Sequence, residues 1–380
     1  MMLSAVSGQR PDRDVQAREV MYVPTFSSRT GGFVGGVMAA PPTSGDGPLV
    51  GPAGPDVTVV IPTFGRHQVL LDTIERALAT DPPPAEVIVV DQTPDHPPAV
   101  TATLRRFADR GAIRWIRVRI ASQPAAMNLG LLAARTQYVL FHDDDVVQDP
   151  GIVGAVARAI QRARGAAPSC WCVCGQVIQP EQTVVSIDSS KRYFQFPFNS
   201  DRACFLDDAM AGNLCVHRQR AIDLGGFDEN FLGAAYRCET EFARRVVRAG
   251  GKVYFEPSAS LRHLRAPTGG VRVHGDNRRT WRPYFPVGSY YIALRTGARE
   301  AVRTALWLPW RASATRYHVR HPWFIPVTFT SNCLGLGLAL SLWARGPRLI
   351  SRARARASSF ASELVRAPAC DAVPQRTESS

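Results

Sequence analysis

Short apolar runs alternate with helical patterns over residues 57–142. Four runs are rich in β-branched and other apolar side chains and predict buried strands: residues 57–63, 86–91, 113–120 and 137–142. Between them, apolar residues recur at helical spacing in three segments, residues 67–79, 100–110 and 124–134. Alternating strands and helices of this length predict an α/β fold, with a mostly parallel sheet and helices on both faces.

The pattern is less regular after residue 150. It predicts one helix over residues 152–164, a second that begins near residue 239 and ends at residue 248, and helical structure from about residue 284. It also predicts strands over residues 170–178, 252–256 and 259–264. Pro257 is expected to separate two of these strands. Residues 180–205 read as irregular and aromatic, and we expect those rings to pack rather than to stack on a sugar.

Composition divides the chain into four parts. Residues 1–55 carry Gly, Pro and Ser clusters without sustained periodicity and predict a disordered extension. Residues 56–280 predict one nucleotide-binding α/β domain, and residues 281–356 a helical, basic region. Residues 357–380 predict a disordered tail.

A cluster of carboxylates follows the strand of residues 137–142. Asp143, Asp144 and Asp145 come directly after it, and Asp91 ends the strand of residues 86–91. Ligands of open α/β sheets bind at the carboxyl ends of strands, and a divalent cation carrying a diphosphate would offset the repulsion among these carboxylates. An acidic loop or a helix N-cap is the alternative. The chain has no P-loop and no Gly-x-Gly-x-x-Gly after the first strand, which disfavours ATP and dinucleotides.

The chain is basic, with a net charge of +13. Nucleic acid, anionic lipid and phosphorylated substrates all suit such a surface. No zinc-finger, helix-turn-helix or aromatic RNA-binding pattern supports the first of these, so we expect no nucleic-acid partner. The eight Cys residues have no Cys-x-x-Cys spacing and are expected to be buried free thiols in a reducing cytoplasm.

Six segments carry recognisable motifs in a fixed order: 59–66 (VVIPTFGR), 87–94 (VIVVDQTP), 125–131 (AAMNLGL), 143–145 (DDD), 225–229 (GGFDE) and 239–245 (ETEFARR). Together they resemble the motifs of family 2 glycosyltransferases with the GT-A fold, over more than half the chain. Two positions depart from the family pattern. Asp-Gln-Thr-Pro replaces the usual Asp-Asp-Gly-Ser after the second strand, and Cys238 stands where a carboxylate usually precedes the catalytic Glu.

The resemblance implies a nucleotide-diphosphate sugar as the donor substrate. Pro62, Thr63 and Arg66 would form the nucleotide-binding turn after the first strand. Asp91 would contact the base, and Asn128 lies on the helix that would cover the nucleotide.

The Asp-x-Asp motif implies a divalent metal, Mg²⁺ or Mn²⁺. Asp143 would contact the ribose and the ion, Asp145 would ligate the ion, and Asp144 would belong to the donor site. His263 resembles the late metal or diphosphate ligand of the family, and a hydrogen-bonded strand histidine is the alternative.

The resemblance also implies a general base. Glu239 would remove the proton of the acceptor hydroxyl in a single, inverting displacement, and burial would raise its pKa toward the working pH. Glu241 competes for this role, unless its carboxylate is paired with Arg245. Gly212 and Asn213 are expected to line the sugar or acceptor pocket, with helix capping as the alternative.

Residues 323–344 are mostly apolar and long enough to cross a bilayer, and an Arg cluster follows them. We expect an amphipathic or re-entrant helix that contacts the membrane surface through residues 323–356, with Arg facing anionic lipid. A true span and a buried interface helix are the alternatives.

These features predict an inverting, metal-dependent glycosyltransferase with a glycan or lipid-linked acceptor. It would act in glycolipid, polysaccharide or glycoconjugate biosynthesis, in the cytoplasm at the inner face of the plasma membrane. The alternatives are a polyprenyl-phosphate sugar synthase and a non-catalytic nucleotide-sugar-binding partner protein.

Overall fold

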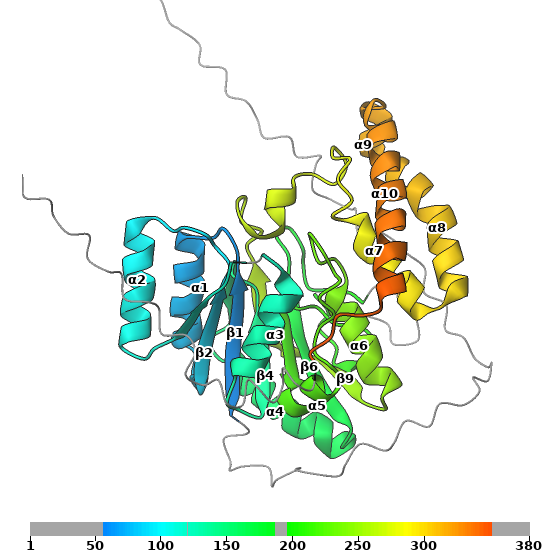
Figure 1. Cartoon of the computed structure of the whole chain (residues 1–380). Helices are drawn as coiled ribbons and strands as arrows, with labels where there is room; N and C mark the ends of the chain where they lie inside the picture. Colours follow the sequence, from blue (N-terminus) through cyan, green and yellow to red (C-terminus); the bar gives the residue numbers. More distant parts are fainter. Residues whose placement is uncertain (1–55, 120, 187–195, 352–380) are drawn as a thin grey trace, which may run out of the picture.

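The computed structural model describes residues 56–119, 121–186 and 196–351 (Figure 1). The predicted disordered segments, residues 1–55 and 357–380, lie outside this part. The described residues form one nine-stranded sheet in the order β3-β2-β1-β4-β8-β6-β9-β5, with β7 paired to β9. Its strands are β1 (Val57–Thr63), β2 (Glu86–Asp91), β3 (Arg114–Arg117), β4 (Tyr138–His142), β5 (Val146–Gln148), β6 (Cys170–Ile178), β7 (Cys204–Leu206), β8 (Asn213–His217) and β9 (Lys252–His263). The helices are α1 (Gln68–Leu78), α2 (Pro98–Asp109), α3 (Gln123–Ala133), α4 (Ile152–Ala166), α5 (Arg218–Asp223), α6 (Cys238–Arg248), α7 (Pro286–Thr296), α8 (Ala298–Ser313), α9 (Arg316–Arg320) and α10 (Phe324–Arg345).

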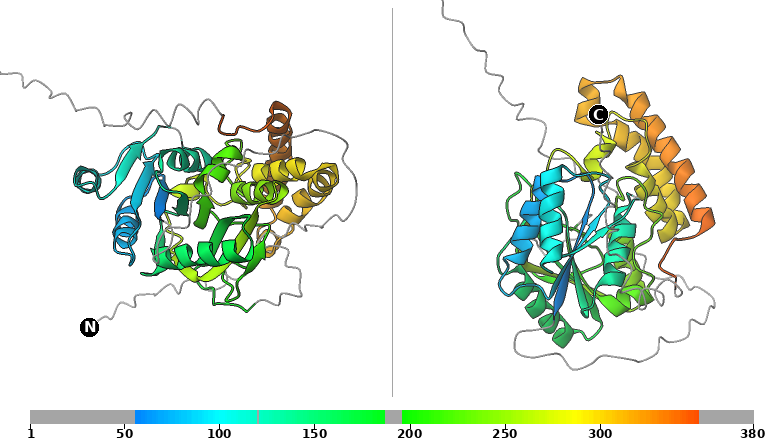
Figure 2. Two further views of the ribbon diagram at one scale, coloured as in Figure 1. Left: turned by 90° about the horizontal axis from the view of Figure 1, so that it is seen from below. Right: turned by 60° about the vertical axis from the view of Figure 1, so that its left-hand side comes forward.

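The first half of the sheet is parallel, as the sequence predicts. β1 pairs with β2 on one side and with β4 on the other, and β3 pairs with β2. α1 and α4 cover one face of the sheet, and α3 and α6 cover the other (Figure 2). The register places Thr63 beside Asp91. The carboxyl ends of β1, β2 and β4 therefore meet at one edge, and the predicted α/β class is confirmed.

The second half of the sheet is mixed, and three of its strands, β5, β7 and β8, are missing from the sequence prediction. β8 lies antiparallel between β4 and β6, and β5 lies antiparallel to β9. β8 has five residues, all buried, and continues directly into α5, so its pattern does not alternate. Because His142 pairs with Asn213, β8 brings Gly212 to the carboxylates that follow β4.

Residues 252–263 form one strand, β9, although the sequence predicts a break at Pro257. β9 runs parallel to β6, and the pairing shifts between Gly175 and Gln176. Residues 257–259 have no partner on β6 and bulge out of the ladder. Pro257 lies in this bulge, where its missing N–H removes no ladder hydrogen bond.

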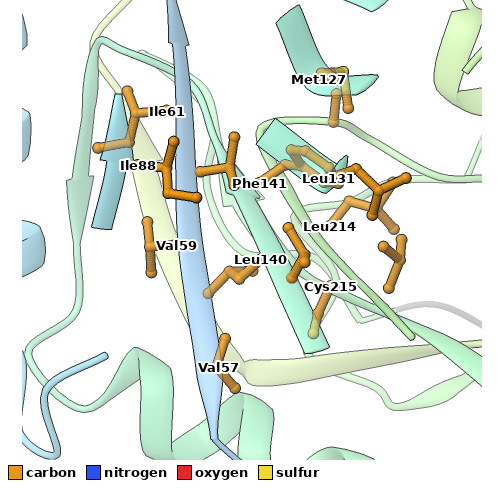
Figure 3. Packing of buried hydrophobic residues seen from close by; sticks show 14 of the residues in the cluster. Val57, Val59, Ile61, Ile88, Met127, Leu131, Leu140, Phe141, Leu214 and Cys215 are labelled. Carbon is orange, nitrogen blue, oxygen red and sulfur yellow. The ribbon is translucent and has the colours of Figure 1, made fainter. Parts of the chain in front are cut away.

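The main hydrophobic core lies between the sheet and its helices. Side chains of β1, β4 and β8 pack together with Met127 and Leu131 of α3 (Figure 3). α3 approaches β1 closely at Gly130, where a Cβ atom would lie 2.3 Å from Val60 Cγ1. The helix can therefore reach the strand only because residue 130 has no side chain.

Of two predictions about buried side chains, the one about cysteines is confirmed only in part within the described residues. Cys170, Cys172, Cys174, Cys215 and Cys238 are buried free thiols, whereas Cys204 is partly buried and Cys333 is exposed. The packing of the aromatic residues is confirmed for two rings. The aromatic side chains of Phe196 and Phe198 pack against Phe255, with ring centroids 4.8 and 6.2 Å away.

The C-terminal helices form a layer beside the sheet domain (Figures 1 and 2). Phe231, Tyr290 and Tyr291 belong to a second core cluster, which α7, α8 and α10 share. Within the described residues, α10 alone is long and apolar enough to cross a membrane by length and composition. One side of α10 packs against α7 and α8 and the other is exposed. After α10 the chain returns to the sheet domain, where Ile350 N donates to Gly225 O at 2.7 Å.

Replacing Gly130 should show how tightly α3 packs on β1. Gly130→Ala is expected to lower the free energy of unfolding by about 1–3 kcal/mol, because the new methyl group must displace Val60. Urea denaturation would measure the change. Gly165→Ala in α4 is the control, since a Cβ atom there meets nothing within 4 Å. Equal stability of the two variants would contradict the close packing.

Candidate active site

Three carboxylates follow β4 and lie in different surroundings. The side chain of Asp143 is 30% exposed, whereas that of Asp144 is 10% and that of Asp145 is 2% exposed. Asp143 therefore faces outward at the sheet edge, and the other two point into the protein.

Arg66, in the loop after β1, binds the two inner carboxylates. Its Nε donates to Asp144 Oδ1 at 3.3 Å and its Nη2 to Asp145 Oδ2 at 2.9 Å. Its Nη1 donates to Ala266 O, in the loop after β9, at 3.0 Å. One guanidinium therefore joins the segments that follow β1, β4 and β9.

Asp144 is engaged on its other side by Thr63. Thr63 Oγ1 donates to Asp144 Oδ2 at 2.7 Å. Burial raises the pKa of Asp144 to about 7, although Arg66 and Thr63 lower it. The structure thus brings together three residues expected at the donor site, with Asp144 held inside the protein by the other two.

His263, at the end of β9, faces the two remaining carboxylates. Its Nε2 lies 3.4 Å from Asp143 Oδ2 and 3.4 Å from Asp145 Oδ1. Its Nδ1 accepts a hydrogen bond from Arg265 N at 2.9 Å, so the Nε2 proton points at the carboxylates. Burial lowers the pKa of His263, but Asp143 and Asp145 outweigh it and the pKa is raised. Within the described residues, no three such side chains form a preformed metal cage.

Gly212 and Asn213 adjoin this cluster in different ways. A Cβ atom at Gly212 would lie 2.5 Å from Asp143 Oδ2, so glycine lets the carboxylate rest on the backbone. Asn213 is fully buried, and its Nδ2 donates to Ala259 O at 2.8 Å and to Gln176 O at 3.1 Å. Asn213 thus fixes the β9 bulge.

Glu239 lies in the first turn of α6, beside Cys238. Cys238 Sγ donates to Glu239 Oε2 at 3.2 Å. Desolvation, with smaller contributions from the charges of Asp208 and Asp143, raises the pKa of Glu239 to about 7, although the Cys238 thiol lowers it. The charge of Asp143 therefore acts on Glu239 across the sheet edge. Asp208 is a member of this group that the sequence analysis missed.

Glu241, the competing base, is occupied by cations. Arg245 Nε donates to its two carboxylate oxygens at 2.9 and 2.8 Å, and Arg295 Nη2 lies 3.3 Å away. Arg245 also donates to Leu224 O and Gly226 O. Glu241 therefore joins α6, α7 and the turn at residues 225–229.

Asp91 is fully buried at the end of β2. It accepts hydrogen bonds from Thr93 N, Trp115 Nε1 and the His96 ring, each at 2.9 Å. Burial raises the pKa of Asp91, but these hydrogen bonds outweigh it and the pKa is lowered. His67 Nδ1 lies 3.0 Å from His96 Nδ1, on the exposed side of this group. The sequence analysis missed both histidines, although His96 lies only five residues after Asp91.

Asn128 of α3 holds the Gly-Gly-Phe-Asp-Glu turn at residues 225–229. Its Oδ1 accepts from Phe227 N at 2.7 Å, and its Nδ2 donates to Phe227 O at 2.8 Å. Its Nδ2 also donates to Glu229 Oε1 at 3.1 Å. Gly226, with φ +64°, permits this contact, because a Cβ atom there would lie 2.3 Å from Asn128 Oδ1. Pro62, the remaining predicted donor-site residue, lies within β1 opposite Val90 of β2.

The structure is similar to several solved glycosyltransferases at low sequence identity. One is the mannosyltransferase PcManGT from Pyrobaculum calidifontis in complex with GDP-Man and Mn2+, with 18% identity and a TM-score of 0.47 over 79% of this chain and 92% of that chain. GalNAc-T7 with UDP, GalNAc and Mn2+ has 15% identity and a TM-score of 0.46 over 71% of this chain. TarS from S. aureus has 13% identity and a TM-score of 0.47 over 81% of this chain. The chain spans 58% of GalNAc-T7 and 54% of TarS.

A search of curated proteins found no match. Residues 58–213 match the family described as Glycosyl transferase family 2. This match extends from β1 to the start of β8 and includes the parallel half of the sheet and the three carboxylates after β4. The chain therefore carries a glycosyl transferase family 2 domain over residues 58–213.

Proposed function

We propose that this chain is an inverting, metal-dependent glycosyltransferase that moves a sugar from a nucleotide-diphosphate donor to a hydroxyl acceptor. The observation that carries this proposal is the position of Glu239. It has a pKa of about 7 and lies within the electrostatic reach of Asp143, the exposed carboxylate of the Asp-x-Asp motif. A carboxylate that titrates near neutrality suits a general base.

Asp143, Asp145 and His263 are the residues that would hold the metal. Two carboxylate oxygens lie within 3.4 Å of one imidazole nitrogen, and this donor set fits a hard divalent cation. Mg²⁺ or Mn²⁺ bound there would neutralise charge on the leaving diphosphate. His263 Nε2 must lose its proton to become a ligand, so metal binding is expected to weaken as the pH falls.

Glu239 would act on the acceptor. Its carboxylate takes the hydroxyl proton while the acceptor oxygen attacks the anomeric carbon, on the face opposite the diphosphate. The bond from the anomeric carbon to the diphosphate oxygen breaks, and the diphosphate leaves with the bonding electrons. One displacement inverts the configuration.

His67 and His96 are added to the proposed donor site. Asp91, the expected base contact, is enclosed by Trp115, His96 and its own turn. A base at this end of the sheet would therefore meet the histidines, with Asp91 orienting the His96 ring.

We extend the proposal to a glycan or lipid-linked acceptor in glycolipid, polysaccharide or glycoconjugate biosynthesis, at the inner face of the plasma membrane. The apolar helix α10 and the basic C-terminal region support the membrane contact. Residues 352–356 of the predicted contact lie outside the described residues.

Glu239→Gln should leave donor binding unchanged and reduce transfer about 10²-fold or more, because the amide accepts no proton. Radiolabelled sugar transfer and calorimetric donor binding would measure the two effects. Glu241→Gln is the matched variant, and it should lower thermal stability but retain transfer. If Glu239→Gln retained transfer to a phosphate acceptor, the chain would instead be a polyprenyl-phosphate sugar synthase.

The pH profile of kcat should rise through about pH 7 and level off above it, because Glu239 accepts a proton only when ionised. Cys238→Ala removes the hydrogen bond that lowers the pKa of Glu239, so this limb should move to higher pH. Cys238→Ser keeps a donor and should stay close to the wild type. Identical profiles for Cys238→Ala and the wild type would contradict the assigned role of the thiol.

Calorimetry with UDP, GDP, dTDP and CDP, with Mn²⁺ and again with EDTA, tests the donor site. We expect metal-dependent binding of one nucleotide, and its loss in Asp145→Ala. Asp223→Ala, an exposed carboxylate at the end of α5, is the control. Binding without transfer to any acceptor would favour a nucleotide-sugar-binding partner protein, and unchanged metal affinity in Asp145→Ala would exclude the proposed ligand.

A further inference from the structure

Most tryptophans of this chain lie in its C-terminal helical region and are exposed. Five of the seven are between 51% and 67% exposed: Trp281, Trp307, Trp310, Trp323 and Trp343. All five lie in the C-terminal helices or directly before them. Large exposed rings that gather in one region mark an interaction surface.

On α8 the exposed apolar residues follow a helical stripe. Val302, Leu306 and Trp310 are spaced four residues apart and are 59%, 66% and 66% exposed. Trp307 lies beside them. Trp310 also contacts Phe329 of α10, with ring centroids 5.2 Å apart, so the apolar stripe of α8 continues onto α10.

The exposed side of α10 is the reverse of that of an ordinary surface helix, which presents charged residues to water. Apart from the terminal Arg345, every exposed residue of α10 is uncharged. The group includes Ile325, Leu334, Leu340 and Trp343. The buried side of α10 instead carries mainly small and polar residues, namely Thr328, Ser331, Asn332, Gly335 and Ala339. A Cβ atom at Gly335 would lie 2.9 Å from Pro286 Cγ. We call the α8 stripe, Trp323 and the exposed side of α10 the tryptophan face.

Positive charge accompanies this face. Residues 286–351 contain eight Arg and no Lys, and their one acidic residue, Glu300, accepts a hydrogen bond from Arg303. Exposed Arg299 and Arg311 lie at the two ends of α8, and exposed Arg316 and Arg320 lie on α9. A symmetric dimer through this face would bring two copies of the same positive surface together. An anionic surface matches both the charge and the rings.

We propose that the tryptophan face docks on an anionic lipid bilayer, with the indole rings at the headgroup level and Arg facing lipid phosphates. Trp prefers the membrane interface because its ring is apolar and its N–H is polar. α10 would lie on the bilayer rather than cross it, since one side of it is packed against α7 and α8. This inference deepens the membrane contact of the proposed function and moves its centre from the Arg cluster at residues 345–356 to α8 and α10.

The tryptophan face is tied to the catalytic domain by the segment that follows α10. Gly346 O accepts from Asn230 Nδ2 at 2.8 Å, and Arg348 N donates to Asp228 Oδ1 at 2.9 Å. Asp228 belongs to the turn that Asn128 holds on α3, and Asn230 directly follows that turn. The active site therefore keeps a fixed orientation to the docked surface, which suits an acceptor carried by a lipid in the same bilayer.

Co-sedimentation of the full chain with vesicles, without donor or acceptor, tests the docking surface independently of catalysis. The wild type should bind vesicles of phosphatidylcholine with phosphatidylglycerol, with a shift of Trp emission to shorter wavelength, and bind phosphatidylcholine alone more weakly. The double variant Trp307→Gln/Trp310→Gln should lose roughly tenfold or more in binding. Arg316→Gln/Arg320→Gln should weaken only the anionic, salt-sensitive component.

Val184→Gln, an exposed apolar position in the sheet domain, is the control and should bind like the wild type. Thermal unfolding and calorimetric nucleotide binding should be the same for all variants, which separates docking from folding and from the donor site. Absence of wild-type binding, or equal binding by the tryptophan variant, would overturn the proposal. A dimer in sedimentation velocity that the tryptophan substitutions dissociate, without vesicle binding, would assign the face to a second copy.

Discussion

The active site depends on the guanidinium of Arg66. Three consecutive carboxylates at the end of one strand repel each other, and two of them are buried, where charges are weakly screened. Arg66 binds Asp144 and the Oδ2 atom of Asp145, which leaves Asp143 and the Oδ1 atom of Asp145 on the side of His263. Because the same group also binds Ala266 O, the segments after β1, β4 and β9 are held together by one side chain. A truncated Arg66 would leave buried, unpaired carboxylates, which cost far more than one lost contact.

The parallel half of the sheet could be predicted from the sequence because its strands and helices are local. Each strand is a continuous apolar run, and each helix follows within a few residues. β8 and β5 could not be predicted from the sequence, since segments of five and three residues are too short to show a periodic apolar pattern. Their pairing with β4 and β9 joins residues far apart in the chain. Pro257 was misleading for a similar reason, because the bulge that accommodates it exists only against β6.

In the candidate site, too, the sequence predicts which residues are present but not which partners they bind. The motifs indicate which residues gather at the sheet edge, and the structure brings Asp143, Asp145 and His263 together. Partners are set by long-range packing, which no motif records. Asp91 was expected to contact a base, yet it is enclosed by Trp115 from the neighbouring strand β3. Asn128 was expected to cover a nucleotide, but its side-chain amide is hydrogen-bonded to the turn at residues 225–229.

The departure at Cys238 affects the proposed base directly. A carboxylate at this position would add a negative charge beside Glu239, which Asp208 and Asp143 already influence, and like charge raises a carboxyl pKa. Burial keeps the pKa of the Cys238 thiol well above its usual range, so it stays neutral when Glu239 ionises. Its S–H donates to the Glu239 carboxylate and favours the ionised form. The cysteine thus allows a desolvated glutamate to titrate near neutrality, whereas a second carboxylate would raise its pKa further.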